Sequence, residues 1–192
     1  SAILHESGIV TEFSPEALRE ASECEHDIPV VSGRCDFRDK VIFTIDGADA
    51  KDLDDAISVE KNGSGYILGV HIADVSNYVK ENSALDKDAM ARGTSVYFTD
   101  KVVPMLPTAL SNGACSLNAG EDKYAISAFI RLDREGNILS LDLAPTVIRS
   151  KVRGVYSEVN DLFVNEKASP FYAKYRPVYA ALMKMRELYR IL

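Results

Sequence analysis

The chain has 192 residues, 46% hydrophobic and 27% charged, which is typical of a soluble globular protein long enough to bury a core. No apolar run approaches the roughly 20 residues of a membrane span, so no membrane partner is expected. The net charge of −7 counts against a large phosphate-binding surface, although a metal bound to the acidic stretch described below would invert the field there. Three cysteines without a C-x-x-C pair argue against a zinc site and for a reducing, cytoplasmic compartment.

Residues 1–37 are predicted to be a lead-in segment with one short helix. Ser14, as an N-cap, and Pro15, at the first helical position, are typical of a helix start. This helix should end near Cys24. The polar residues that follow, 25–40, predict a loop.

The next part of the chain favours strands. A strand over Val41–Ile45 would deliver Asp46 at its end, and an Asn-Gly turn predicts a hairpin after it. A second hairpin is predicted further on. The four strands of the two hairpins are expected at 56–60, 66–73, 125–132 and 138–148.

The region between the hairpins is predicted to be mixed. Ser83, with an acid three residues later, has the capping-box pattern and starts a short helix that should end at Gly93. β-branched and aromatic residues predict a strand over 94–98. Proline and glycine in 100–122 predict mostly irregular structure.

Helices are predicted at the end of the chain. Ser157 is expected to cap one that buries Val159, Leu162 and Phe163, and Ser169 to start another. After that, apolar residues keep helical spacing up to Leu192, where no cap follows. We therefore expect the chain to have been cut from a longer protein.

Five aspartates lie within ten residues, between apolar runs on both sides. Two carboxylates about 5 Å apart repel by roughly 3 kcal/mol at an effective dielectric constant near 20. Hard divalent cations offset such repulsion and prefer oxygen ligands. The stretch therefore predicts a magnesium or manganese site, provided that the loop curls so that its carboxylates converge. The predicted ligands are Asp46, Asp52, Asp54 and Asp55.

Other interpretations of the acidic stretch are weaker. An EF-hand loop starting at Asp52 would need glycine where Ile57 stands and glutamate where Gly63 stands. A phosphatase of the haloacid-dehalogenase type would need a second aspartate at position 48, which is Ala48. A solvated acidic turn is the plain alternative, and Leu53 counts against it by drawing the segment towards the core.

Three further features have a structural and a functional interpretation. His71 lies in an apolar strand, where a buried structural histidine is about three times as frequent as a ligand or catalytic base. Tyr97 is either a core residue or a platform on which a nucleobase stacks. The basic residues Arg149, Lys151 and Arg153 favour a solvated face, with contacts to phosphates as the alternative.

Several motifs together resemble the RNase II/RNase R exoribonucleases, and RNase R more closely than RNase II. They are Thr44–Ala56, Val70–Ser76, Arg92–Tyr97, Pro104–Pro107 and Leu110–Asn118. The resemblance implies an α+β fold with curved antiparallel sheets, or a partial barrel, wrapped by helices. Residues 38–192 would then be the N-terminal part of an RNB catalytic domain, about half of its length.

The same resemblance implies a processive 3′→5′ exoribonuclease that hydrolyses single-stranded RNA to nucleoside 5′-monophosphates. The four aspartates named above would be catalytic and would hold Mg²⁺, as one or two ions that Mn²⁺ can replace, with Asp54 the most important. Tyr97 would clamp the 3′-terminal nucleotides. The full-length protein is expected to be a cytoplasmic monomer.

Because further catalytic groups of the family lie beyond this stretch, the 192-residue chain alone is expected to be inactive or nearly so. Two other functions are weighed. One is a catalytically silent RNA-binding or regulatory paralogue, against which the intact set of aspartates argues. The other is a different metal-dependent phosphohydrolase.

Overall fold

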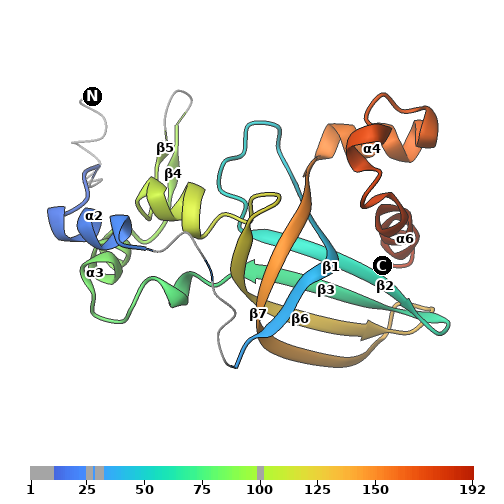
Figure 1. Cartoon of the computed structure of the whole chain (residues 1–192), viewed down its shortest axis with the longest axis horizontal. Helices are drawn as coiled ribbons and strands as arrows, with labels where there is room; N and C mark the ends of the chain where they lie inside the picture. The colour runs from blue at the N-terminus through green and yellow to red at the C-terminus, as the bar shows by residue number, and fades with distance from the viewer. Residues whose placement is uncertain (1–10, 25–27, 29–32, 99–101) are drawn as a thin grey trace. The chain divides into compact units, whose positions relative to one another are not determined.

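The computed structural model describes residues 11–24, 28, 33–98 and 102–192, which belong to two compact units (Figure 1). One unit combines the N-terminal residues up to His26 with Val75–Cys115, and the other combines Asp27–Asp74 with Ser116–Leu192. The predicted lead-in helix therefore belongs to the same unit as residues from the middle of the chain. Across the described ranges, no helix is long and apolar enough to cross a membrane.

Two capped helices form the centre of the smaller unit. Helix α2 (Pro15–Ser22) begins as predicted, with the Ser14 hydroxyl accepting the N–H of Ala17. Helix α3 (Ala84–Arg92) begins at Ser83, whose hydroxyl accepts the N–H of Asp86. It ends at Gly93, whose φ of +74° suits a residue without a side chain.

The other elements of this unit are short. The strand predicted over 94–98 is reduced to two residues that pair antiparallel with two others, and a π-helix lies where irregular structure was expected. Residues 99–101, which join the two short strands, lie outside the described part. The elements are η1 Val75–Asn77, β4 Val96–Tyr97, β5 Val102–Val103 and η2 Ala109–Ala114.

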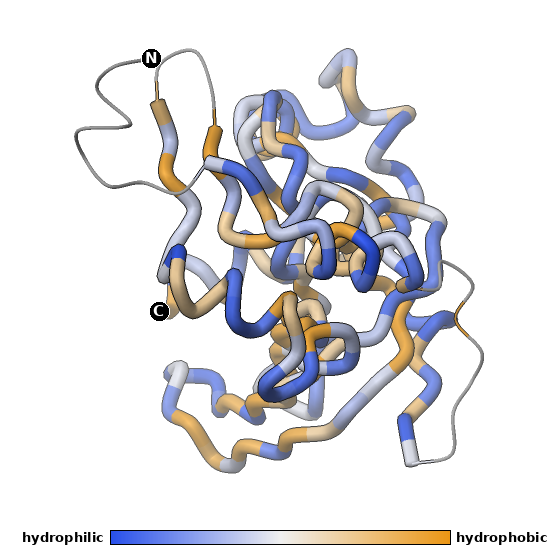
Figure 2. The backbone as a smooth tube through the Cα atoms, turned by 90° about the vertical axis from the view of Figure 1, so that its left-hand side faces the viewer, coloured by the Kyte–Doolittle hydropathy of each residue, from blue (hydrophilic) through white to orange (hydrophobic). Residues whose placement is uncertain are grey.

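The larger unit is a closed five-stranded barrel in which the strands follow the order β1-β2-β3-β6-β7. Both predicted hairpins are present, with β2 paired to β3 and β6 to β7, and the alternation of apolar and polar residues along the chain can be followed in Figure 2. The strands are β1 Cys35–Asp46, β2 Asp55–Asn62, β3 Gly65–Ala73, β6 Asp122–Leu132 and β7 Ile138–Val155.

β1 and β7 extend furthest beyond their predicted bounds, and their extra residues close the barrel. β1 begins at Cys35, inside the predicted loop, of which residues 25–27 and 29–32 lie outside the described part. β7 continues beyond its predicted end to Val155. The two strands pair in parallel from Cys35 opposite Thr146 to Asp46 opposite Val155, whereas every other pairing in the barrel is antiparallel.

The close approach of β1 and β7 depends on Gly154. A Cβ atom at this position would lie 2.4 Å from the backbone oxygen of Thr44, which is far inside a normal contact distance. Glycine therefore lets the two strands meet next to the end of β1.

Helices at the end of the chain pack beside the barrel, where they are coloured orange to red in Figure 1. The first begins one residue after β7 ends, with Val155 at the N-cap position and no side-chain cap, so the prediction that Ser157 caps it is wrong. Val159 and Leu162 are buried as predicted. The helices are α4 Tyr156–Asn165, η3 Glu166–Ala168, α5 Tyr172–Tyr175 and α6 Tyr179–Tyr189.

The main apolar core lies between the barrel and these helices. Phe43 of β1 and Val152 of β7 contribute from the barrel, and Leu162 of α4 and Leu182 of α6 from the helices. Leu192 is 71% exposed and lies outside this core. The core thus holds the helices against the barrel whose strands carry the acidic residues.

Candidate functional site

The acidic residues lie on one loop at one end of the barrel. Asp46 is the last residue of β1, Asp55 is the first of β2, and Asp52 and Asp54 lie in the loop between them. We call the segment Asp46–Asp55 the acidic loop. The four carboxylates predicted as metal ligands are close enough to interact electrostatically, since the charges of the other three all act on Asp54.

Leu53 anchors the acidic loop in the barrel. Its side chain is 1% exposed, its N–H donates to Ser116 Oγ at 3.1 Å, and its carbonyl accepts the N–H of Leu117 at 2.8 Å. The Ser116 hydroxyl donates in turn to the carbonyl of Lys51 at 3.2 Å. The loop is therefore curled, as the metal hypothesis requires, and it is held by residues distant in sequence.

Arg153 of β7 anchors the other half of the acidic loop. Its Nη2 donates to the carbonyl oxygens of Ala48 at 3.0 Å and Ala50 at 2.6 Å. The N–H of Ala50 also donates to the carbonyl of Gly47, which closes a tight turn. One guanidinium thus satisfies two carbonyls of a segment that has no regular secondary structure.

Two of the carboxylates are in an environment that disfavours their charge. Burial raises the pKa of Asp46, and the charges of Asp55 and Asp52 add to this effect. The Thr44 side chain and the charge of Arg153 oppose it. Burial also raises the pKa of Asp54, followed by repulsion from Asp52, Asp55 and Asp46. A bound cation would remove this penalty.

The acidic loop fits a hard divalent cation in two respects. Its donors are all carboxylate oxygens, which such cations prefer. In addition, Asp46 Oδ2 is buried and has no hydrogen-bond partner within the described residues. Among those same residues, however, no three carboxylate, histidine or cysteine groups are already arranged to hold a metal. The structure brings the predicted ligands onto one curled loop without closing them into a coordination shell.

Tyr97 belongs to the smaller unit, where it lies on β4. It is 64% exposed, which excludes the interpretation as a core residue. An exposed ring is what a stacking platform requires.

His71 is a buried structural residue, as expected. Its Nε2 lies 3.0 Å from Ser58 Oγ and its Nδ1 lies 2.7 Å from Ser127 Oγ, both inside the barrel. Burial lowers the pKa of this imidazole to about 4, so it is neutral at physiological pH.

Of the basic residues predicted to favour a solvated face, Arg149 is exposed, whereas Lys151 and Arg153 are half-buried. Arg149 pairs with Asp122 at 2.6 Å, Lys151 Nζ donates to the carbonyl of Arg38 at 2.5 Å, and Arg153 holds the acidic loop. Sequence reasoning also missed the anchoring role of Ser116. A polar residue inside the otherwise apolar run 114–117 was the available signal.

The chain is similar to known proteins over nearly its whole length. The RNB domain profile matches residues 34–192. Ribonuclease R of Thermotoga maritima is 48% identical over 182 residues, and Ribonuclease R 1 of Lactococcus lactis is 44% identical over 193. These alignments cover 93% and 99% of this chain but only 26% and 23% of the relatives. The chain therefore spans about a quarter of the length of the curated relatives it matches.

The same relationship is seen in three dimensions. RNase R of Mycoplasma genitalium, solved in complex with ribose-methylated single-stranded RNA, superposes with a TM-score of 0.90 at 34% identity. That match covers 99% of this chain and 30% of the RNase R chain. This match shows the expected α+β architecture. In the present structure the barrel is closed by one parallel strand pair, β1 with β7. From the profile match and from these relatives, the chain belongs to the RNB domain family.

Proposed function

We propose that this chain supplies the metal-binding part of a 3′→5′ exoribonuclease that hydrolyses single-stranded RNA to nucleoside 5′-monophosphates. The observation that carries the proposal is the acidic loop, in which four carboxylates share one anchored segment and Asp46 Oδ2 has no partner in the described residues. The identity of 44–48% to ribonucleases R over nearly the whole chain supports it.

Asp46, Asp52, Asp54 and Asp55 are the proposed ligands of Mg²⁺, with Mn²⁺ as the alternative ion. When bound, such cations activate a water and stabilise the attacking and leaving oxygens of an in-line displacement at phosphorus. The contribution of this chain is to hold the carboxylates in place before the metal arrives. Leu53 and Arg153 do so through hydrogen bonds that involve the backbone of the loop.

Tyr97 is proposed to stack on a base near the 3′ end of the RNA. Such a contact has little dependence on the base, because every base has a π-face, and it is worth about 1–3 kcal/mol. Little sequence preference is therefore expected. A monomeric, cytoplasmic full-length protein remains part of the proposal and is supported by the sequence alone.

The test replaces Asp54 by asparagine, which keeps the shape and removes the charge. Calorimetric titration of Mg²⁺ or Mn²⁺ into the chain should give binding that the variant loses. Asp49→Asn is the matched control, since it makes the same change at an exposed position of the same loop that is not a proposed ligand.

Hydrolysis is measured on the chain alone and on the Thermotoga maritima relative carrying this chain in place of its own matching segment. The chain alone should release almost no mononucleotide. The chimaera should degrade a 5′-labelled homopolymer RNA, and Asp54→Asn should reduce the rate roughly 100-fold or more, equivalent to about 2.7 kcal/mol. Turnover of p-nitrophenyl phosphate without turnover of RNA would favour a different phosphohydrolase and overturn the proposal.

A further inference from the structure

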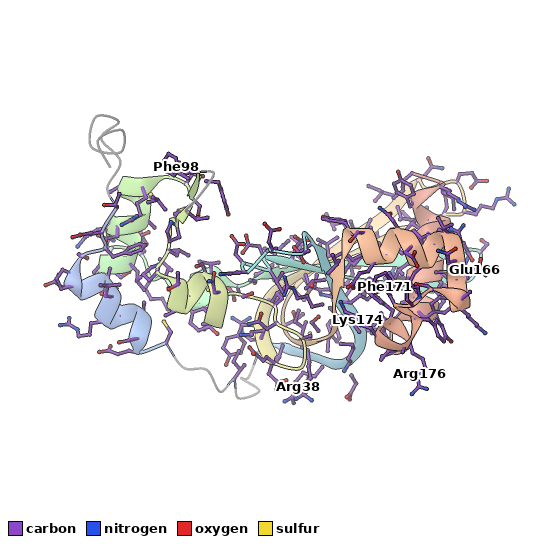
Figure 3. The ribbon with its side chains drawn as sticks, turned by 90° about the horizontal axis from the view of Figure 1, so that it is seen from above. Arg38, Phe98, Glu166, Phe171, Lys174 and Arg176 are labelled. Carbon is purple, nitrogen blue, oxygen red and sulfur yellow. The ribbon has the colours of Figure 1, made fainter. Side chains whose placement is uncertain are left out.

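A hollow of about 390 Å³ lies beside the acidic loop, and we call it the cationic hollow. Three of its six lining residues carry a positive charge, and none carries a negative charge. The lining residues are Ala48 of the acidic loop, Lys151, Val152, Arg153 and Val155 of β7, and Lys174 of α5. Figure 3 shows Lys174 on the C-terminal helical segment where it meets the strands.

The charges of the hollow differ in how far they are neutralised. Lys174 forms an ion pair with Glu158 at 2.5 Å. Lys151 and Arg153 instead donate to backbone carbonyl oxygens, and within the described ranges no ion pair includes either of them. The charge of Arg153 nevertheless acts on the carboxylates of Asp46 and Glu158. A carbonyl orients a cation without cancelling its charge.

Arg153 also retains an unused donor. Its Nη2 holds the acidic loop, but its Nε is buried and has no hydrogen-bond partner in the described part of the chain. A buried donor without a partner costs about 1–3 kcal/mol. The guanidinium is therefore fixed in position with hydrogen-bonding capacity to spare.

Neighbouring cations and carboxylates of this kind suit a phosphate ester. The acidic loop by itself repels an RNA backbone, and the chain as a whole is negative. Arginine binds phosphate through directed N–H groups and lysine binds it as a point charge. The hollow offers one arginine and two lysines, and Ala48 of the acidic loop is part of its lining. A phosphate bound there would lie next to the acidic loop.

We propose that the cationic hollow binds a phosphate group of RNA, or of the mononucleotide released from it, next to the acidic loop. This site deepens the function proposed above and rests on it for the identity of the ligand. Binding itself needs neither metal nor hydrolysis, so the site can be tested on its own.

The experiment is an NMR titration of the ¹⁵N-labelled chain in the presence of EDTA. The probes are adenosine, AMP and a tetra-adenylate with hydroxyl groups at both ends, which carries only internal phosphates. AMP should shift the amide signals of Ala48 and of residues 151–155, and adenosine should not. Binding of the tetramer identifies the site with the RNA backbone, whereas binding of AMP alone identifies it with the released product.

Lys151→Met is the diagnostic variant, because it keeps the length of the side chain and removes the charge. It should weaken binding of AMP about 5–10-fold and lower the slope of log affinity against log salt by roughly 0.7–1. The matched control is Arg149→Gln on the same strand. Arg149 is paired with Asp122 and does not line the hollow, so its replacement should leave both quantities unchanged.

Lys151→Met also removes a contact to the Arg38 carbonyl, so its folding is checked by circular dichroism. If it does not fold, Lys174→Met on the surface of α5 replaces it, with an expected loss of about 2–5-fold. The proposal is overturned if adenosine shifts the same signals as AMP, or if the folded variant binds AMP as tightly as Arg149→Gln. If AMP binding depends on Lys151 but the chimaera degrades no RNA, the proposed function is overturned and the phosphate site stands.

Discussion

Two acid-bearing loops at opposite ends of the barrel use their carboxylates in opposite ways. At the turn between β6 and β7, Asp133 accepts hydrogen bonds from the N–H groups of Glu135 and Asn137 and from the side chain of Asn137. These bonds, led by the one from the Asn137 side chain, lower the pKa of Asp133. All of these hydrogen bonds lie within the turn, so the Asp133 carboxylate stabilises the turn itself.

The acidic loop is instead held by residues that lie outside it. Ser116 and Arg153 hold its backbone from outside, while Asp46 and Asp54 have raised pKa values. Hydrogen bonds from its neighbours thus stabilise the charge of Asp133, whereas burial and repulsion disfavour the charges of Asp46 and Asp54. The following predictions test this contrast in order of decreasing effect.

Ser116→Ala should cause the largest loss of stability, because it leaves the buried N–H of Leu53 without its acceptor. The expected cost is about 1–3 kcal/mol in the free energy of unfolding, with faster hydrogen exchange at the Leu53 amide. Ser157→Ala is the control, since Ser157 is exposed and caps no helix. An equal loss of stability in both variants would show that Ser116 is not a specific anchor of the loop.

Asp133→Ala should have a smaller effect that depends on pH. Because the pKa of Asp133 is lowered on folding, its stabilisation is present above the ordinary value of 3.8 and is lost as the pH falls through the folded pKa. The variant should therefore have a lower Tm than the parent at pH 7, and the gap should close as the pH falls through the folded pKa of Asp133. Thermal unfolding followed over this range provides the measurement, and a gap independent of pH would contradict the account.

Asp54→Asn should have the smallest effect on stability and the opposite sign. The raised pKa means that the folded, metal-free chain binds this proton more tightly than the unfolded chain, so the fold loses stability as the pH rises through the folded pKa. In EDTA the variant should be slightly more stable than the parent at pH 7 and equal to it below about pH 3. A variant less stable than the parent at pH 7 would show that Asp54 has a structural role like that of Asp133.

Local features were predictable from the sequence because their chemistry is contained in a few adjacent residues. The caps at Ser14 and Ser83 and the hairpin at Asn62-Gly63 are of this kind. Ser157 shows the limit of such reasoning. Its pattern fits a cap, but β7 continues to Val155 and the helix starts before Ser157 can act.

The parts that were not predictable depend on residues far apart in the chain. The parallel pairing of β1 with β7 has no local signal, so neither the start of β1 nor the end of β7 was anticipated. The same holds for the candidate site. Its aspartates were evident from their spacing, whereas Ser116 and Arg153 become anchors only once the barrel is closed.

Closure of the barrel by its first and last strands has a consequence for the order of events during synthesis. Asp46 reaches its final position only when Val155 pairs with it, more than a hundred residues later in translation. Contacts of such high sequence separation slow folding, and they need both segments to be present. The acidic loop of the nascent chain should therefore not reach its final conformation until β7 has left the ribosome. A cation-binding site should not form before that point in synthesis.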